Sequence, residues 1–125
     1  RSQRIRPETA IQQLINPRWV PLLQTPPFPE YVSGHSVVSA AAAAVLTKIF
    51  GSSFAYNDNT ETEFGLPIRK YNSFKQAAEE AALSRLYGGI HFKDAIDEGL
   101  VLGKKTGAYI IYKLENYFKA LQSKL

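Results

Sequence analysis

Residues 96–114 read IDEGLVLGKKTGAYIIYKL, and two helical patterns overlap in them. Apolar residues and glycines recur at steps of three and four, the spacing of one face of an α-helix. This stripe consists of Ile96, Leu100, Gly103, Gly107, Ile111, Leu114, Phe118 and Leu121. Gly99, Gly103 and Gly107 lie on nearly one face, where the missing side chains permit a very close neighbour. We therefore predict a long, tightly packed helix from His91 or Lys93 to Leu121.

A run of small residues supplies a partner for that helix. Five alanines stand in a row at residues 40–44, and alanine combines high helix propensity with little bulk. Ser33 or Ser36 can cap the start of this helix, and Gly51 follows Phe50 as a stop signal. A close helix pair is the expected core of the domain.

Two more helices are predicted, separated by loops. The first begins at Pro7 and reaches Leu14 or Ile15, and the other runs from a capping box at Ser73 to about Tyr87. The proline-rich residues 17–31 are too apolar for a loose linker and predict an ordered, packed loop. Residues 52–71 read as a long polar loop, either a lid or an insertion. With no strand or internal repeat expected, the fold class is all-α.

Composition sets wide limits. The chain has 125 residues, fits one domain, and has 45% hydrophobic and 21% charged residues. It has no cysteine, which excludes disulfides and thiolate metal sites, and no methionine, which indicates a piece of a longer protein. The net charge of +4 is scattered and fits a solvated surface, although a basic protein could also bind nucleic acid or an anionic membrane. No secretory signal is visible.

Two motif-like patterns in the glycine-containing stretch need no functional explanation. Gly99 to Thr106 is one residue short of a phosphate-binding P-loop, and lysine stands where Ser or Thr should follow Gly-Lys. The Gly-x-x-x-Gly stripe is interrupted by Lys104 and Lys105, and no apolar run approaches the roughly 20 residues of a membrane span. A packing face explains both.

Two histidines carry the chemistry. His35 and His91 each stand at a predicted helix start, where unpaired N–H groups attract anions. Arg6 and Arg85 could line a shared anion pocket with permanently charged, forked donors. Each residue could instead be an ordinary polar surface residue. A metal site built from His35, His91, Asp94 and Asp97 is a further alternative.

These segments together resemble a superfamily that comprises type 2 phosphatidic acid phosphatases, bacterial non-specific acid phosphatases and vanadium-dependent haloperoxidases. Its signature blocks are Lys-x6-Arg-Pro, Pro-Ser-Gly-His and Ser-Arg-x5-His-x3-Asp. Arg6-Pro7 matches the end of the first block, Ser33-Gly34-His35 the second, and Ser84-Arg85 with His91 the third. The blocks stand in the right order over about residues 6–107, and the flanking sequence is most similar to the haloperoxidase-related bacterial branch.

The sequence departs from this signature at three points. The lysine of the first block would fall just before Arg1, and Val32 replaces the proline of the second block. Ala95 stands where the final aspartate is expected, with Asp94 and Asp97 nearby. The sequence thus leaves open which of these two acids orients His91.

The resemblance implies a helical bundle with an oxyanion site between helices at one end. His91 would be the nucleophile that forms phosphohistidine, or the ligand of vanadate. Arg6, Arg85, Ser33 and Gly34 would bind the oxyanion, and His35 would move a proton. These residue types suit that chemistry, because fixed cations and N–H donors stabilise charge spread over oxygens.

Further expectations follow from the resemblance. Residues 1–125 would be the C-terminal catalytic part of a bundle whose N-terminal helices lie outside this chain, and the piece alone would be poorly active. Vanadate is the expected cofactor if the protein is a haloperoxidase, with halide and peroxide as substrates; a phosphatase would take a phosphate ester. An envelope or secreted location is also implied. The rival hypothesis is a non-catalytic basic helical module that binds an acidic partner or nucleic acid.

Overall fold

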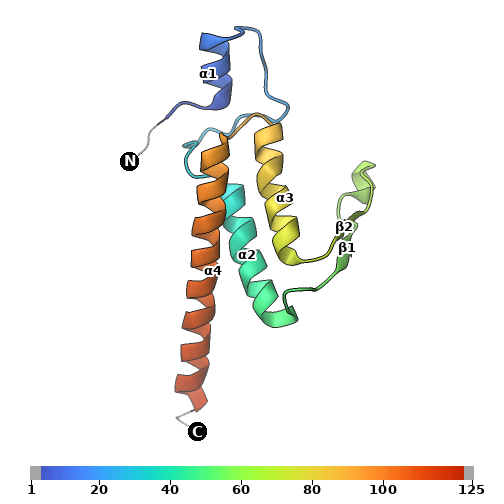
Figure 1. Cartoon of the computed structure of the whole chain (residues 1–125), viewed down its shortest axis with the longest axis vertical. Coiled ribbons are helices and arrows are strands. Elements are labelled where there is room, and N and C mark those ends of the chain that lie inside the picture. Colours follow the sequence, from blue (N-terminus) through green and yellow to red (C-terminus); the bar gives the residue numbers. More distant parts are fainter. Residues whose placement is uncertain (1–3, 123–125) are drawn as a thin grey trace.

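The computed structural model describes residues 4–122. The described elements are α1 (Pro7–Leu14), α2 (Gly34–Phe50), β1 (Tyr56–Asp58), the 3-10 helix η1 (Thr62–Phe64), β2 (Arg69–Tyr71), α3 (Phe74–Tyr87) and α4 (Lys93–Gln122). Helices α2, α3 and α4 lie side by side, and α1 stands above one end of them (Figure 1). The four helices dominate the structure, which confirms the all-α helical class.

The helices begin and end near the predicted signals. The Ser33 hydroxyl accepts a hydrogen bond from the Ser36 N–H at 3.4 Å, and Gly51 closes α2 with a φ of 95°. At α3 the Ser73 hydroxyl accepts from the Gln76 N–H at 3.1 Å. The Gln76 side chain in turn accepts from the N–H of Asn72, one residue before the position expected in a capping box. The local chemistry of the sequence therefore sets the bounds of both helices.

The glycine stripe of α4 packs against the alanine face of α2, as predicted. A Cβ atom on Gly103 would lie 2.3 Å from the carbonyl oxygen of Val37 and 2.7 Å from the Cβ of Ala40. A Cβ on Gly107 would lie 2.6 Å from the Cβ of Ala44. Backbone atoms and the Cβ of an alanine cannot move aside as the end of a flexible side chain can, so these contacts require glycine.

The apolar stripe of α4 is buried over only part of its length. Ile96 is buried, whereas Leu114, Phe118 and Leu121 are exposed in the described structure. The prediction of one continuous packing seam is therefore wrong for the C-terminal half. The reason is visible in Figure 1: α4 extends well past the ends of α2 and α3.

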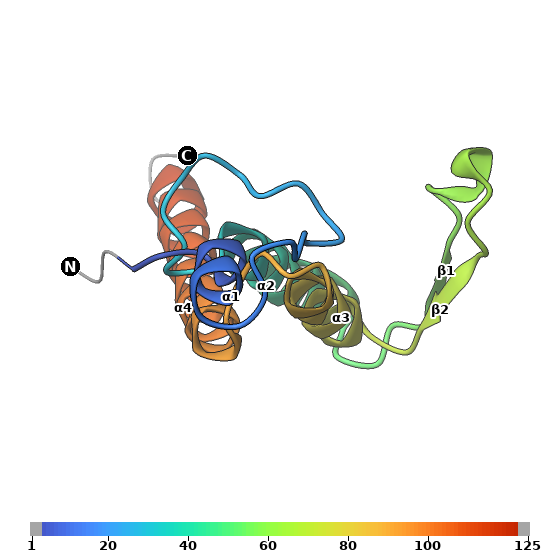
Figure 2. The same ribbon diagram turned by 90° about the horizontal axis from the view of Figure 1, so that it is seen from above.

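The predicted loop at residues 52–71 contains two short strands, which corrects the expectation that the chain has none. Strands β1 and β2 pair antiparallel, with Tyr56 opposite Tyr71 and Asp58 opposite Arg69. The arm that they form projects away from the helices (Figure 2). An aromatic cluster anchors its base; its members are Phe50, Phe54, Tyr56, Tyr71 and Phe74. The strands are too short to produce a recognisable two-residue alternation in the sequence.

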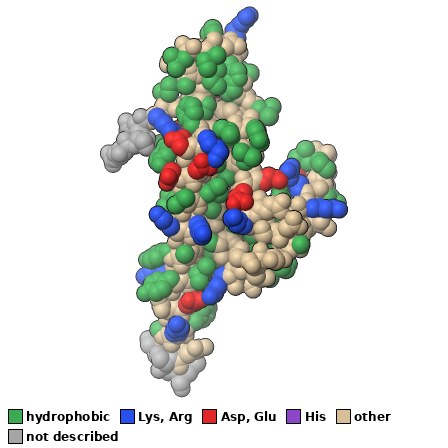
Figure 3. Space-filling model, in the orientation of Figure 1, with side chains coloured by type: hydrophobic (Ala, Val, Ile, Leu, Met, Phe, Trp, Pro, Cys, Tyr) green, Lys and Arg blue, Asp and Glu red, His purple; other side chains and the backbone are tan. Residues whose placement is uncertain are grey.

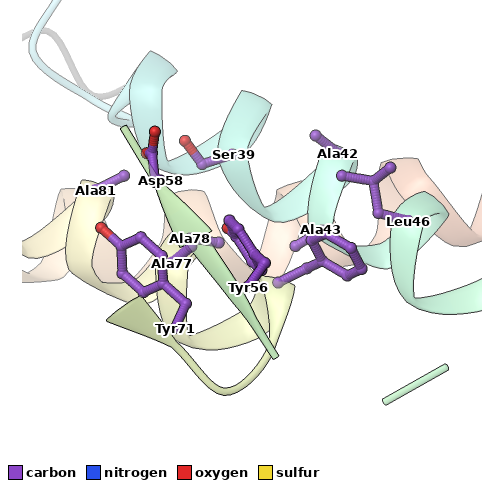
Figure 4. A pocket seen from close by; sticks show the side chains of 11 residues that line it. Ser39, Ala42, Ala43, Leu46, Tyr56, Asp58, Tyr71, Ala77, Ala78 and Ala81 are labelled. Carbon is purple, nitrogen blue, oxygen red and sulfur yellow. The ribbon is translucent and has the colours of Figure 1, made fainter. Parts of the chain in front are cut away.

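A hollow of about 270 Å³ lies between the arm, α2 and α3 (Figure 4). Tyr56 and Tyr71 border it from the arm, and Ser39 and several alanines border it from the helices. None of the residues expected to bind an oxyanion lines it. Within residues 4–122, no helix has the length and the apolar composition that crossing a membrane requires.

Candidate active site

Arg6 is anchored at the start of α1 and is nearly buried, with 8% of its surface exposed. One terminal nitrogen, Nη1, donates to the carbonyl oxygen of Ile90 at 2.6 Å, and the other, Nη2, donates to that of Phe28 at 2.7 Å. Its Nε is buried without a hydrogen-bond partner in the described structure. Arg6 is thus a fixed cation that retains one unused donor.

His91 lies in the connection between α3 and α4 and is 1% exposed. Its Nε2 is 3.2 Å from Nη1 of Arg6, and its Nδ1 is 3.4 Å from Oε1 of Glu30. Guanidinium nitrogens only donate, so Nε2 must offer its lone pair to Arg6. The proton therefore belongs on Nδ1, which lies near the Glu30 carboxylate but makes no hydrogen bond of good geometry in the described structure.

The surroundings of His91 favour the neutral ring. Burial lowers the pKa of His91, and the charge of Arg6 lowers it further, while Glu30 acts in the opposite direction. A neutral imidazole with its proton on Nδ1 presents the Nε2 lone pair as a nucleophile or ligand.

Glu30 replaces the two acids that were expected behind His91. Asp94 instead accepts both terminal nitrogens of Arg4, at 2.6 and 2.7 Å, and Asp97 pairs with Lys93 at the surface. The Glu30 side chain is fully buried, and its Oε1 also accepts the N–H of Phe92 at 2.9 Å. The expectation that Asp94 or Asp97 contacts His91 is therefore corrected.

The sequence held one signal for Glu30. It is the single acidic residue in the proline-rich loop of residues 17–31. A carboxylate in such an apolar, ordered segment needs a partner when it is buried. The sequence favours Asp94 and Asp97 because they are nearer to His91 along the chain.

The proline-rich loop packs against the glycine break before His91, as the predicted ordered loop should. The N–H of Leu23 donates to the carbonyl oxygen of Gly88 at 3.1 Å. Gly89 has a φ of 74°, and a Cβ there would lie 2.7 Å from the ring of Trp19. The paired glycines thus let the loop hold the segment that carries His91.

Ser33, Gly34 and His35 form the start of α2. The Ser33 N–H donates to the carbonyl oxygen of Ala95 at 3.0 Å, which ties this start to the first turn of α4. The first N–H groups of a helix, Gly34 among them, have no partner within the helix. The Ser36 N–H donates to the Ser33 hydroxyl, which leaves the N–H groups of Gly34 and His35 for an anion.

His35 lies within the electrostatic influence of Arg85. His35 is exposed, and its pKa is lowered by partial burial and then by the charge of Arg85. Arg85 is half-buried, and its Nε donates to the Ser84 hydroxyl at 3.0 Å. The structure therefore places Arg6 beside His91 and the charge of Arg85 near His35.

The alternative metal site is not assembled. Among residues 4–122, no three His, Asp or Glu side chains are grouped so that they could hold a metal ion. Asp94 and Asp97 are engaged in the ion pairs described above. The donors that remain are cations, N–H groups and a neutral imidazole, a set that suits an oxyanion.

Comparison with protein families decides where this arrangement belongs. The family model described as the VCPO second helical-bundle domain matches residues 6–120, which include Arg6, the start of α2 and His91. The chain belongs to this family. A search of the curated proteins gives no match.

Solved structures agree with the VCPO-type domain. The chain is 59% identical to a structure described as the first bacterial vanadium-dependent iodoperoxidase, with a TM-score of 0.83 over 87% of this chain. Holo-type and apo-type bacterial vanadium-dependent chloroperoxidases share the fold at 22% identity and a TM-score of 0.68, over 82% of the chain. The chain spans 26% of the length of the iodoperoxidase and under a third of the chloroperoxidases.

Proposed function

We propose that this VCPO-type domain holds vanadate in a haloperoxidase that oxidises halide with hydrogen peroxide. The observation that carries the proposal is the environment of His91, whose Nε2 lone pair faces Arg6 while Nδ1 faces Glu30. The 59% identity to a bacterial iodoperoxidase favours this activity over phosphoester hydrolysis, and favours iodide as the halide.

The residues present fit vanadate. His91 Nε2 would be its ligand once vanadate replaced the present contact of this lone pair with Nη1 of Arg6, and Arg6 and Arg85 would neutralise its oxygens. The unused Nε of Arg6 is a buried donor that an oxyanion oxygen could satisfy. The Gly34 N–H and the Ser33 side chain would add donors at the start of α2, where the helix dipole also favours negative charge.

Bound vanadate would supply Lewis acidity that polarises peroxide for attack by halide. His35 would then move the proton. Its lowered pKa keeps the ring neutral near pH 7, so that it can take a proton from hydrogen peroxide. Overall, peroxide, halide and one proton would give hypohalous acid and water: halide is oxidised by two electrons and peroxide is reduced.

We further propose that residues 1–125 are the C-terminal catalytic part of the pocket, and that other segments of the protein complete it. The lysine of the first signature block has no position in this chain, and the chain spans about a quarter of its iodoperoxidase relative. The 125-residue chain alone should therefore be poorly active.

The test uses the full-length protein with vanadate, hydrogen peroxide and iodide, bromide or chloride in turn. Halogenation that requires vanadate, and is fastest with iodide, is the expected result. Hydrolysis of p-nitrophenyl phosphate that vanadate inhibits, with no halogenation, would show a phosphatase instead. The 125-residue chain, assayed in parallel, should be slow in both reactions, and a normal rate would contradict the proposed division of the site.

The rival hypothesis of a basic binding module has less support. On the face shown in Figure 3, lysine and arginine side chains are interspersed with acidic ones and do not form a single basic patch. Nucleic-acid binding that weakens steeply with salt and is indifferent to His35 and His91 would favour the rival.

A further inference from the structure

Arg4 falls in the unspecified x6 spacer of the first signature block, yet it makes extensive contacts beside the site. Its guanidinium lies over the ring of Tyr31 at 5.2 Å and over that of Phe92 at 5.1 Å. Both terminal nitrogens donate to Asp94, and Nε donates to Oε2 of Glu30. These contacts join the residues before α1, the end of the proline-rich loop and the start of α4.

The contacts with Asp94 and Glu30 use all three guanidinium nitrogens. They raise the pKa of Arg4 above its ordinary range, so the group stays charged. A two-pronged contact with Asp94 fixes the plane of the guanidinium, and the two flanking rings restrict it further. This orientation sets the direction in which Nε donates, and therefore the position of the Glu30 carboxylate that accepts from it.

Both carboxylate oxygens of Glu30 are engaged once Arg4 is in place. Arg4 occupies its Oε2, while its Oε1 accepts the N–H of Phe92 and faces Nδ1 of His91 at 3.4 Å. The side chain is fully buried, and a buried carboxylate needs a paired cation to offset the loss of water. Arg4 is the one cation that contacts it directly in the described structure; Arg6 acts on it at longer range.

We propose that Arg4 is a positioning residue for the oxyanion site: it holds Glu30 against Nδ1 of His91 and thereby keeps the Nε2 lone pair available to the oxyanion. The inference rests on the proposed function, because it assigns Nε2 to the oxyanion. Asp94 has a part in the same chain of contacts, as the anchor of Arg4 and not as the acid behind His91.

The size of the effect can be bounded. Arg6 favours the same tautomer from the Nε2 side, so losing Arg4 should mix the two tautomers and not invert them. Groups that orient the ligands of a bound centre typically change affinity by about 10- to 100-fold. We expect the lower end of this range for Arg4→Gln.

The test measures inorganic phosphate and vanadate binding by calorimetry in the full-length protein, together with ¹⁵N chemical shifts of labelled histidine. Arg4→Gln should weaken binding of both anions by about tenfold and move the His91 signals toward a mixture of tautomers. Arg4→Lys should restore part of the affinity, because one ammonium cannot serve Asp94 and Glu30 together. Arg18→Gln, an exposed arginine in the loop, is the matched control and should change neither reading.

Arg4→Gln overturns the inference if it folds, binds phosphate within twofold of the wild type and leaves the ¹⁵N shifts unchanged. If this variant does not fold, Asp94→Asn carries the test, because Asp94 is exposed. Removing that anchor should weaken phosphate binding by about two- to fivefold and shift the His91 signals in the same direction. An unchanged reading there also overturns the inference.

His91→Ala separates the inference from the proposed function. Vanadate binding that survives His91→Ala unchanged would refute the oxyanion site itself, because Nε2 is assigned as the vanadate ligand. Vanadate binding that needs His91 but is indifferent to Arg4 would refute the positioning role alone.

Discussion

The two histidines occupy contrasting surroundings. His91 is buried between Arg6 and Glu30, with Nη1 of Arg6 at Nε2 and the Glu30 carboxylate 3.4 Å from Nδ1, outside hydrogen-bond geometry. His35 is exposed at the start of α2 and senses Arg85 through its charge. A ligand must hold one fixed direction, whereas a group that carries protons must reach solvent and substrate. The contrast supports the proposed roles, with the oxyanion at His91 and proton movement at His35.

The largest expected effect comes from exchanging each histidine for alanine. His91→Ala should abolish vanadate binding and all turnover, because the ligand atom is lost. His35→Ala should bind phosphate and vanadate nearly as the wild type does, while turnover falls by about 100- to 10,000-fold. Calorimetry and a halogenation assay on the full-length protein separate the two outcomes. Equal loss of vanadate binding in both variants would contradict the different roles proposed for the two histidines.

The acids behind the histidine give the next largest effect. Glu30→Gln removes the carboxylate facing Nδ1 and should reduce vanadate affinity by about 10- to 100-fold. Asp97→Asn breaks only a surface pair with Lys93 and should leave affinity unchanged and stability within about 0.5 kcal/mol. The measurement is vanadate titration together with urea unfolding. If Asp97→Asn were the more damaging change, the assignment of Glu30 would be wrong.

Gly99 of α4 lies against the start of α2. A Cβ there would lie 2.7 Å from the Cβ of Ser36 and 2.9 Å from the carbonyl oxygen of Ser33, at the start of the helix that carries His35. Gly99→Ala should therefore push this start away from α4, with a loss of about 1–3 kcal/mol in unfolding free energy and weaker phosphate binding. Lys105→Ala, at an exposed position on the same helix, is the control. Unaltered stability of Gly99→Ala would show that the helices can separate freely.

The smallest expected effect is a pH dependence of stability. The pKa of His91 is lowered from 6.5 in the folded chain by burial and by Arg6. The unfolded chain therefore binds a proton more readily, and the unfolding free energy should decrease as pH falls below about 6.5. Urea unfolding between pH 8 and about pH 5, without oxyanion, tests this. His91→Gln should flatten the profile more than His35→Gln, because His35 is exposed; the reverse order would contradict the burial difference.

Much of the site could be predicted because it lies in short motifs. The Ser33 side chain caps α2 by accepting from the N–H three residues further on. Gly88 and Gly89 end α3 just before His91. Such signals act within a few residues and can be recognised without the fold. Glu30 could not be found in this way, since it is 61 residues from His91 along the chain and meets it only when the proline-rich loop packs.

The sequence by itself determined the four helices, their caps, and the glycine and alanine faces of α4 and α2, and it indicated the residues of the proposed oxyanion site. These depend on backbone propensity and on steric limits that each residue carries with it. Only the tertiary structure decided that Glu30 faces His91, that Arg4 fixes Glu30, that two strands pair in the arm, and that the outer half of α4 stays exposed. Ion pairs and strand pairs join segments that are distant in the sequence. They stabilise the fold only once packing has brought those segments together and excluded the water between them.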